Sequence, residues 1–391
     1  MLFQTLFIYT SFIVVLYFSG LHIDKRNRTL ALSGKPFGYK DFFKSSIFMF
    51  LFFAILVGMR YGVGADHLNY WLAYEEGVSS RFEYLFQLLS NICSSLGFHP
   101  TVYFGILGLI QIVFLYLAFK DESFLFPFFA IFLFTDGLFG SWMNTIRQDI
   151  ACCIWIFAIN FAIQKKSLQY FLFCFLAFLF HRSAIILVIL YPVFRNGKDY
   201  IHNIPVQLII IVAAFALRNS FESFLIRLDR FFSLYSNIVF LGGDSGFYSS
   251  YSVDSALSSI GQNISSVKQS GIGEIVKIIT YTCIVVFSNK IKSFFNSSKV
   301  NVIYTLFYIS FLTYIILPQG VWSLARPFQF LICTRMIMMS YMTYYFLQKK
   351  EGSNGVIGIA IVATQIILFV SSSIISAQSA YYHGYQLFFQ R

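Results

Sequence analysis

Long apolar runs separated by short polar connections make up most of the chain. The runs lie at about 2–19, 45–59, 101–119, 124–140, 150–163, 168–180, 183–194, 205–217, 272–289, 301–318, 326–347 and 356–375. A helix needs about 20 mostly apolar residues to cross a bilayer. The pattern therefore predicts an all-α polytopic integral membrane protein, built as a single transmembrane domain with about 11–13 transmembrane helices over residues 1–391.

Three parts of this pattern predict something other than a simple span. Residues 82–97 are amphipathic, so we expect an interfacial or re-entrant helix within an external loop at 60–100. If 82–97 spans instead, the orientation of the following elements inverts. Residues 168–194 contain two short apolar halves around His181 with basic residues at both outer ends, which favours a hairpin with His181 at its external turn. The longest polar connection, 218–271, is expected to be a long external loop.

The composition excludes several classes of protein. Hydrophobic residues make up 58% of the chain and charged residues 12%, about half the charged fraction of a typical soluble domain. Such a chain is neither a soluble enzyme nor a disordered segment. The net charge of +11 first suggests nucleic acid or an acidic membrane surface, but no soluble basic domain is present that could bind nucleic acid.

The basic residues separate by type between alternating connections. One set has thirteen Lys and three Arg, and the positive-inside rule assigns it to the cytoplasm. The other set has nine Arg and one Lys and is expected to face outward, as are both termini. The first set is Lys25, Arg26, Arg28, Lys35, Lys40, Lys44, Lys120, Lys165, Lys166, Arg195, Lys198, Lys290, Lys292, Lys299, Lys349 and Lys350. The second set is Arg60, Arg81, Arg147, Arg182, Arg218, Arg227, Arg230, Lys268, Arg326 and Arg391.

An outer face rich in arginine indicates an anionic ligand there. A planar guanidinium holds phosphate or carboxylate through two parallel hydrogen bonds, whereas any compact cation can orient a helix. The alternative is that these arginines pair with carboxylates on the same face. Those carboxylates are Asp66, Glu75, Glu76, Glu83, Asp149, Glu222 and Asp229.

The first polar cluster is Arg60-Tyr61-Gly62-Val63-Gly64-Ala65-Asp66-His67-Leu68-Asn69-Tyr70. Its two glycines allow a sharp turn that exposes backbone N–H groups and brings Arg60 near Asp66. A cation beside a carboxylate suits glycosyl transfer from a lipid pyrophosphate. Alternatively, Arg60 and Asp66 form an ion pair that closes a turn at the membrane surface.

Three further candidates follow in the chain. Asn144-Thr145-Ile146-Arg147-Gln148-Asp149 enters a helix whose free N–H groups favour an anion, and here Asp149 is expected to be a structural helix acid. His181-Arg182-Ser183 lies at a membrane-depth break, where ionisable groups are costly and tend to be functional, although His181 also suits a structural hydrogen bond. Arg326 lies at the outer start of a span.

Other signals are weaker or missing. Lys277 and Arg335 fall inside spans, where their aliphatic stems are expected to carry the charges toward the span ends. No Asp-x-Asp pair, His-Glu-x-x-His motif, Walker loop or helix-opening Gly-x-Gly-x-x-Gly motif occurs. We therefore expect neither a metal site nor a cofactor.

The polar clusters together resemble the motifs of a known family. Arg60-Tyr-x-x-Gly-x-Asp66-x-x-x-Tyr70 is followed by Ile146-Arg147-Gln148-x-x-Ala151, by Phe180-His181-x-Ser183-Ala184 and by Arg326. Their order and spacing are similar to those of the Wzy/EpsG family of bacterial polysaccharide polymerases, with definite motifs over roughly 50–195.

The resemblance implies a membrane-embedded, GT-C-like glycosyltransferase. Such a protein lies in the bacterial inner (plasma) membrane with its active site facing the periplasm. It joins undecaprenyl-pyrophosphate-linked oligosaccharide repeat units into O antigen or a related surface polysaccharide, without a metal. The implied partners are that lipid-linked oligosaccharide, membrane lipids, a chain-length regulator and a flippase, and no nucleic acid.

The resemblance also suggests roles for individual residues. The substrate-binding candidates are Arg60, Tyr70, Arg147, Gln148, Arg182, Tyr248, Tyr251 and Arg326. Among them, the three arginines 60, 147 and 326 would hold the pyrophosphate and stabilise its departing charge. Asp66 or His181 would accept the proton of the acceptor hydroxyl as the catalytic base. Two tyrosines of the 218–271 loop, Tyr248 and Tyr251, would stack on sugar rings.

Two other functions stay open at this point. A lipid-linked oligosaccharide flippase or transporter would also need external cations, but it should carry substrate-binding charges in mid-span and an internal duplication. An O-antigen ligase shares the fold type and the donor chemistry of a polymerase, and the sequence separates the two poorly.

Overall fold

A computed structural model describes residues 2–64, 66–78, 82–218, 271–317, 327–349, 354–371 and 384–390. Within these ranges, seven helices are long and apolar enough to cross a bilayer, one bent helix pair can form a further crossing, and four apolar helices are shorter. These helices confirm the predicted all-α polytopic membrane fold. In the described part of the chain seven helices, or eight crossings with the bent pair, are long enough to span, and the number of about 11–13 transmembrane helices stays a prediction.

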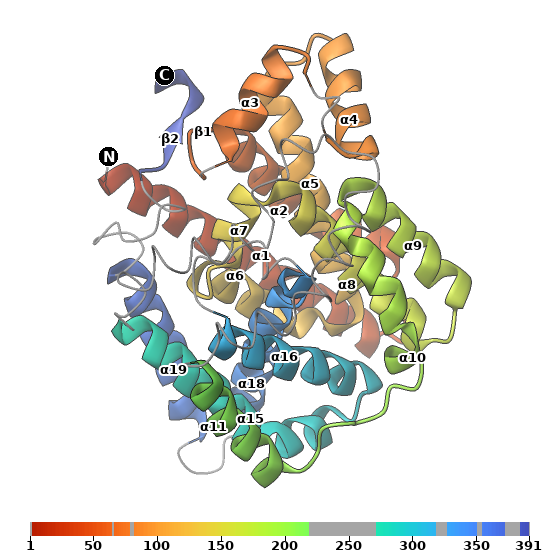
Figure 1. Ribbon diagram of the computed structural model, residues 1–391, viewed down its shortest axis with the longest axis vertical. Coiled ribbons are helices and arrows are strands. Elements are labelled where there is room, and N and C mark those ends of the chain that lie inside the picture. The colour runs from red at the N-terminus through yellow and green to blue at the C-terminus, as the bar shows by residue number, and fades with distance from the viewer. Residues whose placement is uncertain are drawn as a thin grey trace.

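The chain forms a helical bundle with a small group of elements at one end, where α3, α4, β1 and β2 lie (Figure 1). The first part contains α1 (Leu2–Leu32), α2 (Tyr39–Met59), β1 (Arg60–Tyr61), α3 (His67–Glu75), α4 (Tyr84–Ser95), α5 (Pro100–Ala118), η2 (Lys120–Leu125), α6 (Phe126–Thr135), α7 (Leu138–Asn144), α8 (Ile146–Ile163), α9 (Ser167–Phe180), η3 (Arg182–Leu190), α10 (Tyr191–Phe194) and α11 (Ile204–Arg218). The second part contains α15 (Ile272–Phe295), α16 (Ser298–Ile316), α18 (Ile332–Gln348), α19 (Asn354–Leu368), β2 (Gln386–Leu387) and η6 (Phe388–Gln390).

Two helices form the centre of the bundle. α8 packs against α5 and α9, while α18 packs against α6, α15, α16 and α19. Both are apolar on nearly all sides, as expected for helices surrounded by other helices. The motif that contains Arg147 opens α8, so the fold places it in the interior rather than on a flank.

α2 and α5 cross very closely because both present glycine at the contact. A Cβ atom added to Gly58 would lie 2.3 Å from the Thr101 carbonyl oxygen, and one added to Gly105 would lie 3.1 Å from the Ala54 carbonyl oxygen. Small residues allow such close approach of membrane helices, which associate largely through van der Waals packing. This crossing fixes the end of α2, from which the chain enters the Arg60 motif.

The apolar run at 124–140 is broken, so the prediction of one continuous span there is wrong. η2 and α6 form one arm and α7 the other, and the two arms are bent by 65°. The bend follows Asp136, at Gly137, whose φ of 91° lies in the left-handed region that favours glycine. By contrast, the predicted hairpin at 168–194 is present, because α9 and η3 pack against each other on either side of His181.

Lysines and the candidate arginines lie at opposite ends of the bundle. Lys120 Nζ donates to the Phe37 carbonyl oxygen (2.9 Å), just before α2 begins, whereas Arg60 follows the end of α2. α2 has 21 residues and is therefore about 30 Å long. Lys299 and Glu122 form an ion pair (2.7 Å) at the Lys120 end. We call this the lysine end, and the end that carries Arg60 the arginine end.

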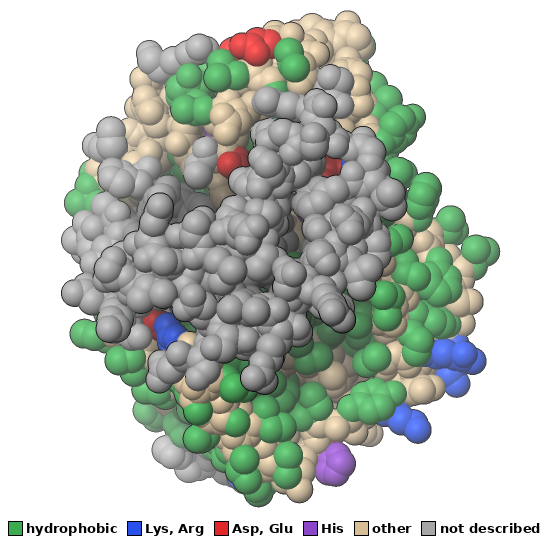
Figure 2. All heavy atoms as spheres, in the orientation of Figure 1, with side chains coloured by type: hydrophobic (Ala, Val, Ile, Leu, Met, Phe, Trp, Pro, Cys, Tyr) green, Lys and Arg blue, Asp and Glu red, His purple; other side chains and the backbone are tan. Residues whose placement is uncertain are grey.

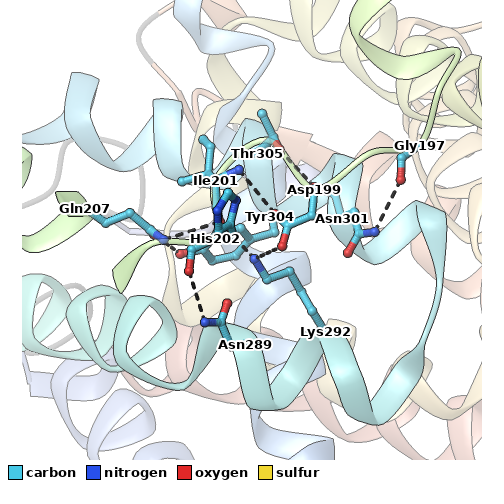
Figure 3. Close-up of polar contacts among 10 residues, drawn as sticks. All are labelled: Gly197, Asp199, Ile201, His202, Gln207, Asn289, Lys292, Asn301, Tyr304 and Thr305. Atoms are coloured by element: carbon cyan, nitrogen blue, oxygen red, sulfur yellow. Dashed lines mark hydrogen bonds and ion pairs between the residues drawn. The ribbon is translucent and has the colours of Figure 1, made fainter. Parts of the chain in front are cut away.

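A polar network joins the segment after α10 to the second part of the chain at the lysine end. Figure 3 shows Lys292 of α15 pointing toward Asp199 and the backbone near Ile201. Its Nζ donates to Asp199 Oδ2 (2.6 Å) and to the Ile201 carbonyl oxygen (2.9 Å). The Gln207 side chain donates to the same carbonyl (3.3 Å), and the Tyr304 hydroxyl donates to Gln207 Oε1. These contacts hold the linker to α11 against α15 and α16.

Large hydrophobic side chains remain exposed on the outside of the bundle. Examples on five different helices are Phe18, Phe48, Phe175, Ile209 and Ile359. In Figure 2 hydrophobic side chains cover much of the right flank, while the larger visible groups of Lys and Arg lie in the lower half of the view. An apolar surface of this extent is suited to contact with lipid chains.

Candidate functional site

The turn after α2 is fastened to the end of α7. Arg60 Nη1 donates to the Met143 carbonyl oxygen (2.9 Å), and the Asp66 backbone N–H donates to Asn144 Oδ1 (2.9 Å). Gly64 has a φ of +98°, and a Cβ atom there would lie 2.6 Å from the Met143 carbonyl oxygen. The glycine is therefore needed both for the turn and for the close approach. The first two polar clusters of the sequence thus meet in space.

Arg60 is held in the interior by backbone rather than by a carboxylate. Its side chain is 1% exposed, and among the described residues it forms no ion pair. The alternative of an Arg60–Asp66 ion pair is therefore not realised, and Arg60 bonds to the Met143 carbonyl oxygen instead. Burial lowers the pKa of Arg60 from 12.5 to about 10, so the guanidinium still carries its charge at neutral pH.

The C-terminal residues help to place Arg60. β1 and β2 pair antiparallel, with Arg60 opposite Leu387. The Tyr385 hydroxyl donates to the Leu56 carbonyl oxygen (2.6 Å), and the Tyr385 backbone N–H donates to Thr5 Oγ1 (2.9 Å). Both ends of the described chain therefore lie beside the Arg60 motif, as Figure 1 also shows.

Arg147 forms a buried ion pair with Glu83, the residue that precedes α4. Nη1 of Arg147 contacts Glu83 Oε2, and the two side chains are 8% and 5% exposed. Nε of Arg147 donates to the Tyr70 hydroxyl (3.4 Å), and the guanidinium lies over the Phe82 ring at 4.8 Å. The alternative that outer arginines pair with nearby carboxylates thus applies to Arg147.

Glu83 is the principal site residue to which the motifs assigned no specific role. Burial alone opposes its ionisation, but Arg147 and the nearby His181 outweigh that effect, and the pKa of Glu83 falls from 4.5 to about 2. α4 carries Glu83 inward because its own inner face, with Phe86 and Cys93, is buried while its other face is exposed. The amphipathic pattern at 82–97 is the signal that points to this placement. With 12 residues, α4 is about 18 Å long and too short to cross a bilayer core of about 30 Å.

Tyr70 lies at the centre of the candidate site. Burial raises the pKa of its phenol, and the charges of Arg147, Asp66 and Glu83 all act on it. Tyr70 also acts on the pKa of Arg60. Charged side chains of the first cluster, of the residue before α4 and of the start of α8 are therefore within electrostatic range of one phenol.

His181 joins this group from the turn between α9 and η3. Its side chain is buried, and its Nδ1 accepts a hydrogen bond from the Ser183 backbone N–H (3.3 Å) and contacts the Ser183 hydroxyl. The structural role that the sequence suggested for His181 is thus present at Nδ1. His181 lies close enough to Glu83 to lower the pKa of that carboxyl, which places it beside the candidate site.

Asp149 has the structural role that the sequence predicted. It accepts hydrogen bonds from Ser141 Oγ (3.0 Å) and Thr145 Oγ1 (2.6 Å), across the junction between α7 and α8. Gln329 donates to the same two hydroxyls, at 3.1 Å and 2.5 Å. The residues just before α18 are thereby tied to the start of the Arg147 motif.

The other candidates are placed less centrally or lie outside the described residues. Gln148 is buried next to Arg147 in α8, and Arg182 is half-buried at the start of η3. Tyr248, Tyr251 and Arg326 lie outside the described residues. The structure therefore brings together Arg60, Asp66, Tyr70, Arg147 and His181, with Glu83 added. This set offers two buried guanidiniums for an anion and two groups, Asp66 and His181, that can accept a proton.

Comparison with known protein families gives a match over most of the chain. The sequence model of the EpsG family matches residues 44–387, which include all the motifs of the candidate site. No curated protein and no solved structure matches the chain.

Proposed function

The chain belongs to the EpsG family, which supports a role in making polysaccharide, and from this we propose a specific reaction. The protein joins undecaprenyl-pyrophosphate-linked oligosaccharide repeat units into O antigen or a related surface polysaccharide. The growing chain leaves its lipid pyrophosphate and is transferred to the non-reducing end of the next lipid-linked unit. The positive-inside rule would place the lysine end in the cytoplasm and the arginine end, with this reaction, at the periplasmic face of the inner membrane.

The observation that carries the proposal is the convergence of three separate motifs around Tyr70. Arg60 and Arg147 come from different elements and are both buried, so their charges are little screened by water. Buried cations that are already in place can stabilise the negative charge that develops on a departing pyrophosphate. We propose that these two arginines perform that role, with no metal and in a GT-C-like membrane glycosyltransferase.

Glu83 then acts as a positioning residue for Arg147. A guanidinium has five N–H donors, so a carboxylate that engages one edge orients the group and leaves it able to bind an anion as well. Gln148 and Arg182 would assist from neighbouring positions. Arg326 would supply a third cation, since it precedes Gln329, which is bonded to Thr145, by only three residues.

The acceptor hydroxyl needs a base within hydrogen-bond reach. Asp66 and His181 are the two candidates. Asp66 precedes Tyr70 in the chain, and His181 lies at the turn between α9 and η3. Tyr248 and Tyr251 would stack on the saccharide from the 218–271 segment. Replacing Asp66 by Asn and His181 by Gln separately, and comparing the pH profiles of polymerisation, identifies which of the two titrates in the reaction.

The test of the whole proposal uses Arg147→Ala in a polymerase-null strain. At wild-type expression we expect the long polysaccharide ladder to disappear, because the leaving charge loses its cation. The matched control is Arg195→Ala, an exposed arginine at the lysine end, which should keep the ladder. An unchanged ladder with Arg147→Ala contradicts the assignment.

A second experiment separates the alternatives and does not depend on a variant that folds. Purified wild-type protein is incubated with lipid-linked repeat units alone. A polymerase gives a ladder, a ligase forms a bond only when a second acceptor is added, and a flippase forms none. Either of the last two outcomes contradicts the proposed function.

A further inference from the structure

A second group of buried charges lies at the break between α6 and α7. Lys277 of α15 donates from Nζ to the Asp136 carbonyl oxygen (2.9 Å), and a Cβ atom added to Gly137 would lie 3.8 Å from the same Nζ. Arg335 of α18 lies over the ring of Tyr281, at 6.0 Å, and the hydroxyl of that tyrosine donates to Asp136; Arg335 is also near enough for its charge to act on that of Lys277. Helices that are far apart in the sequence thus direct two cations at one backbone break.

Arg335 is buried, contrary to the expectation that it reaches a span end. Its residue is 8% exposed, and its guanidinium faces the Tyr314 ring at 5.2 Å and the Tyr281 ring at 6.0 Å. Nε of Arg335 is buried and has no hydrogen-bond partner among the described residues. A buried guanidinium with an unused N–H donor is costly unless an acceptor is supplied.

The nearby carboxylate does not balance these cations. Asp136 accepts its side-chain hydrogen bond from the Tyr281 hydroxyl, and its other carboxylate oxygen is buried without a partner in the described part of the chain. Within that part, none of Lys277, Arg335 and Asp136 takes part in an ion pair. The group therefore carries an excess of one positive charge.

The adjacent Arg218–Glu274 pair, by contrast, joins one cation to one carboxylate. Arg218 Nη1 lies 3.0 Å from Glu274 Oε1, and the pair is neutral as a whole. It leaves the excess charge of the Lys277 and Arg335 group unchanged. Broken helices at membrane depth are tolerated where they are buried in protein or line a water-filled cavity, and charges held at such places commonly mark substrate sites.

We propose that Lys277 and Arg335 bind the pyrophosphate of a second lipid-linked substrate, the acceptor. This assignment rests on the proposed function, in which donor and acceptor both carry a lipid pyrophosphate. The two cationic sites lie at opposite ends of α7, whose seven residues span about 10 Å. The acceptor pyrophosphate must lie away from the reacting centre by the extent of its own oligosaccharide, so a second cationic site at a distance from Arg60 and Arg147 is required.

The first test measures binding of inorganic pyrophosphate to the purified full-length protein in nanodiscs. We expect two equivalents to bind to the wild type and one to the double variant Lys277→Gln/Arg335→Gln. Without ligand, the single variant Arg335→Gln should melt at or above the wild-type temperature, because it leaves one cation, Lys277, with one carboxylate, Asp136, and so removes the excess buried charge. Arg218→Gln, the matched control, should bind two equivalents and melt lower, because it leaves Glu274 unpaired.

A purely structural role for Lys277 and Arg335 predicts the opposite pattern. In that case Arg335→Gln melts lower than the wild type, and pyrophosphate binding by the double variant is unchanged. A further measurement uses only the wild type, so its result does not depend on whether the variants fold. Pyrophosphate should slow acetylation of Lys277, read by mass spectrometry, but not that of the exposed Lys44 at the lysine end. Unchanged acetylation of Lys277 overturns the proposal.

The second test assigns the site to the acceptor. Wild-type protein is offered repeat units either on a lipid pyrophosphate or as neutral methyl glycosides. We compare the ratio of kcat/KM for the lipid pyrophosphate form to kcat/KM for the methyl glycoside. We expect this ratio to fall at least tenfold in the double variant and to stay at the wild-type value in Arg218→Gln. A preference that is unchanged in the double variant overturns the assignment.

The two proposals fail separately. If the wild type makes no ladder but pyrophosphate protects Lys277, the proposed polymerase function is wrong and the anion site stands. If the wild type makes a ladder and Lys277 is not protected, the polymerase function stands and the second site is wrong.

Discussion

Removing the carboxylate from the buried Arg147–Glu83 pair should destabilise the fold as well as the site. Glu83→Gln keeps the shape of the side chain but leaves the Arg147 charge without a counterion at a place where both side chains are at most 8% exposed. Breaking a buried pair in this way typically costs about 3–5 kcal/mol. The aromatic rings around the guanidinium contact it in the wild type and in the variant alike, so they do not offset this loss. We therefore expect a loss of about 3–5 kcal/mol.

The pKa of Glu83 gives an independent magnitude. A fall from 4.5 to about 2 corresponds to about 3 kcal/mol at 1.36 kcal/mol per unit. Because the pKa is lower in the folded state, this stabilisation is complete above about pH 4.5 and is lost as the pH falls toward 2. Wild-type protein should therefore lose about 3 kcal/mol over that interval, and Glu83→Gln should lack this component.

The assay is reversible unfolding in mixed micelles, followed for the wild type, Glu83→Gln, Arg147→Gln and the double variant. A double-mutant cycle isolates the energy of the pair. We expect the double variant to be more stable than either single variant, since no charge is left buried alone. A coupling energy near zero, or a Glu83→Gln protein as stable as the wild type at neutral pH, would refute the reasoning.

Two further predictions concern parts of the fold away from the site. Gly58→Ala should destabilise the protein by about 1–3 kcal/mol through overpacking, since its Cβ would lie 2.3 Å from a carbonyl oxygen. Thermal melting measures this loss. The control Gly355→Ala should melt like the wild type, because no atom lies within 4 Å of the added Cβ. Asp199→Asn removes the partner of Lys292 at the lysine end, so the melting temperature should fall while the ladder made per folded molecule stays the same. A shortened ladder would show that the lysine end takes part in the reaction.

The fold class could be predicted from the sequence because a helix that crosses a bilayer must be long and mostly apolar. The runs of apolar residues mark nearly every helix, and the motifs mark the turn after α2, the start of α8 and the hairpin at His181. The break after Asp136 was missed because the run was read as one span, although Asp136-Gly137 within it is a turn signal. The structure shows in addition that the two arms are bent by 65°.

The candidate site was predictable in its members but not in its contacts. Seven carboxylates shared the outer face in the sequence, and no spacing rule could select Glu83 as the partner of Arg147. That choice depends on how α4 lies against α5 and α9, which is a matter of tertiary packing. The same is true of Lys277 and Arg335, whose burial follows from the position of α15 and α18 rather than from their local sequence.

The pairing of β1 with β2 has a consequence for the order of biosynthesis. Tyr385 bonds to Leu56 although the two residues are 329 positions apart. A ribosome that adds about 5–20 residues per second needs roughly 16–66 s to cover that interval. During this time the Arg60 turn has already left the ribosome but lacks the strand that covers it. The first motif to be translated is thus among the last to be completed, and a chain released before β2 would hold Arg60, Arg147 and Arg326 without the strand that pairs with β1.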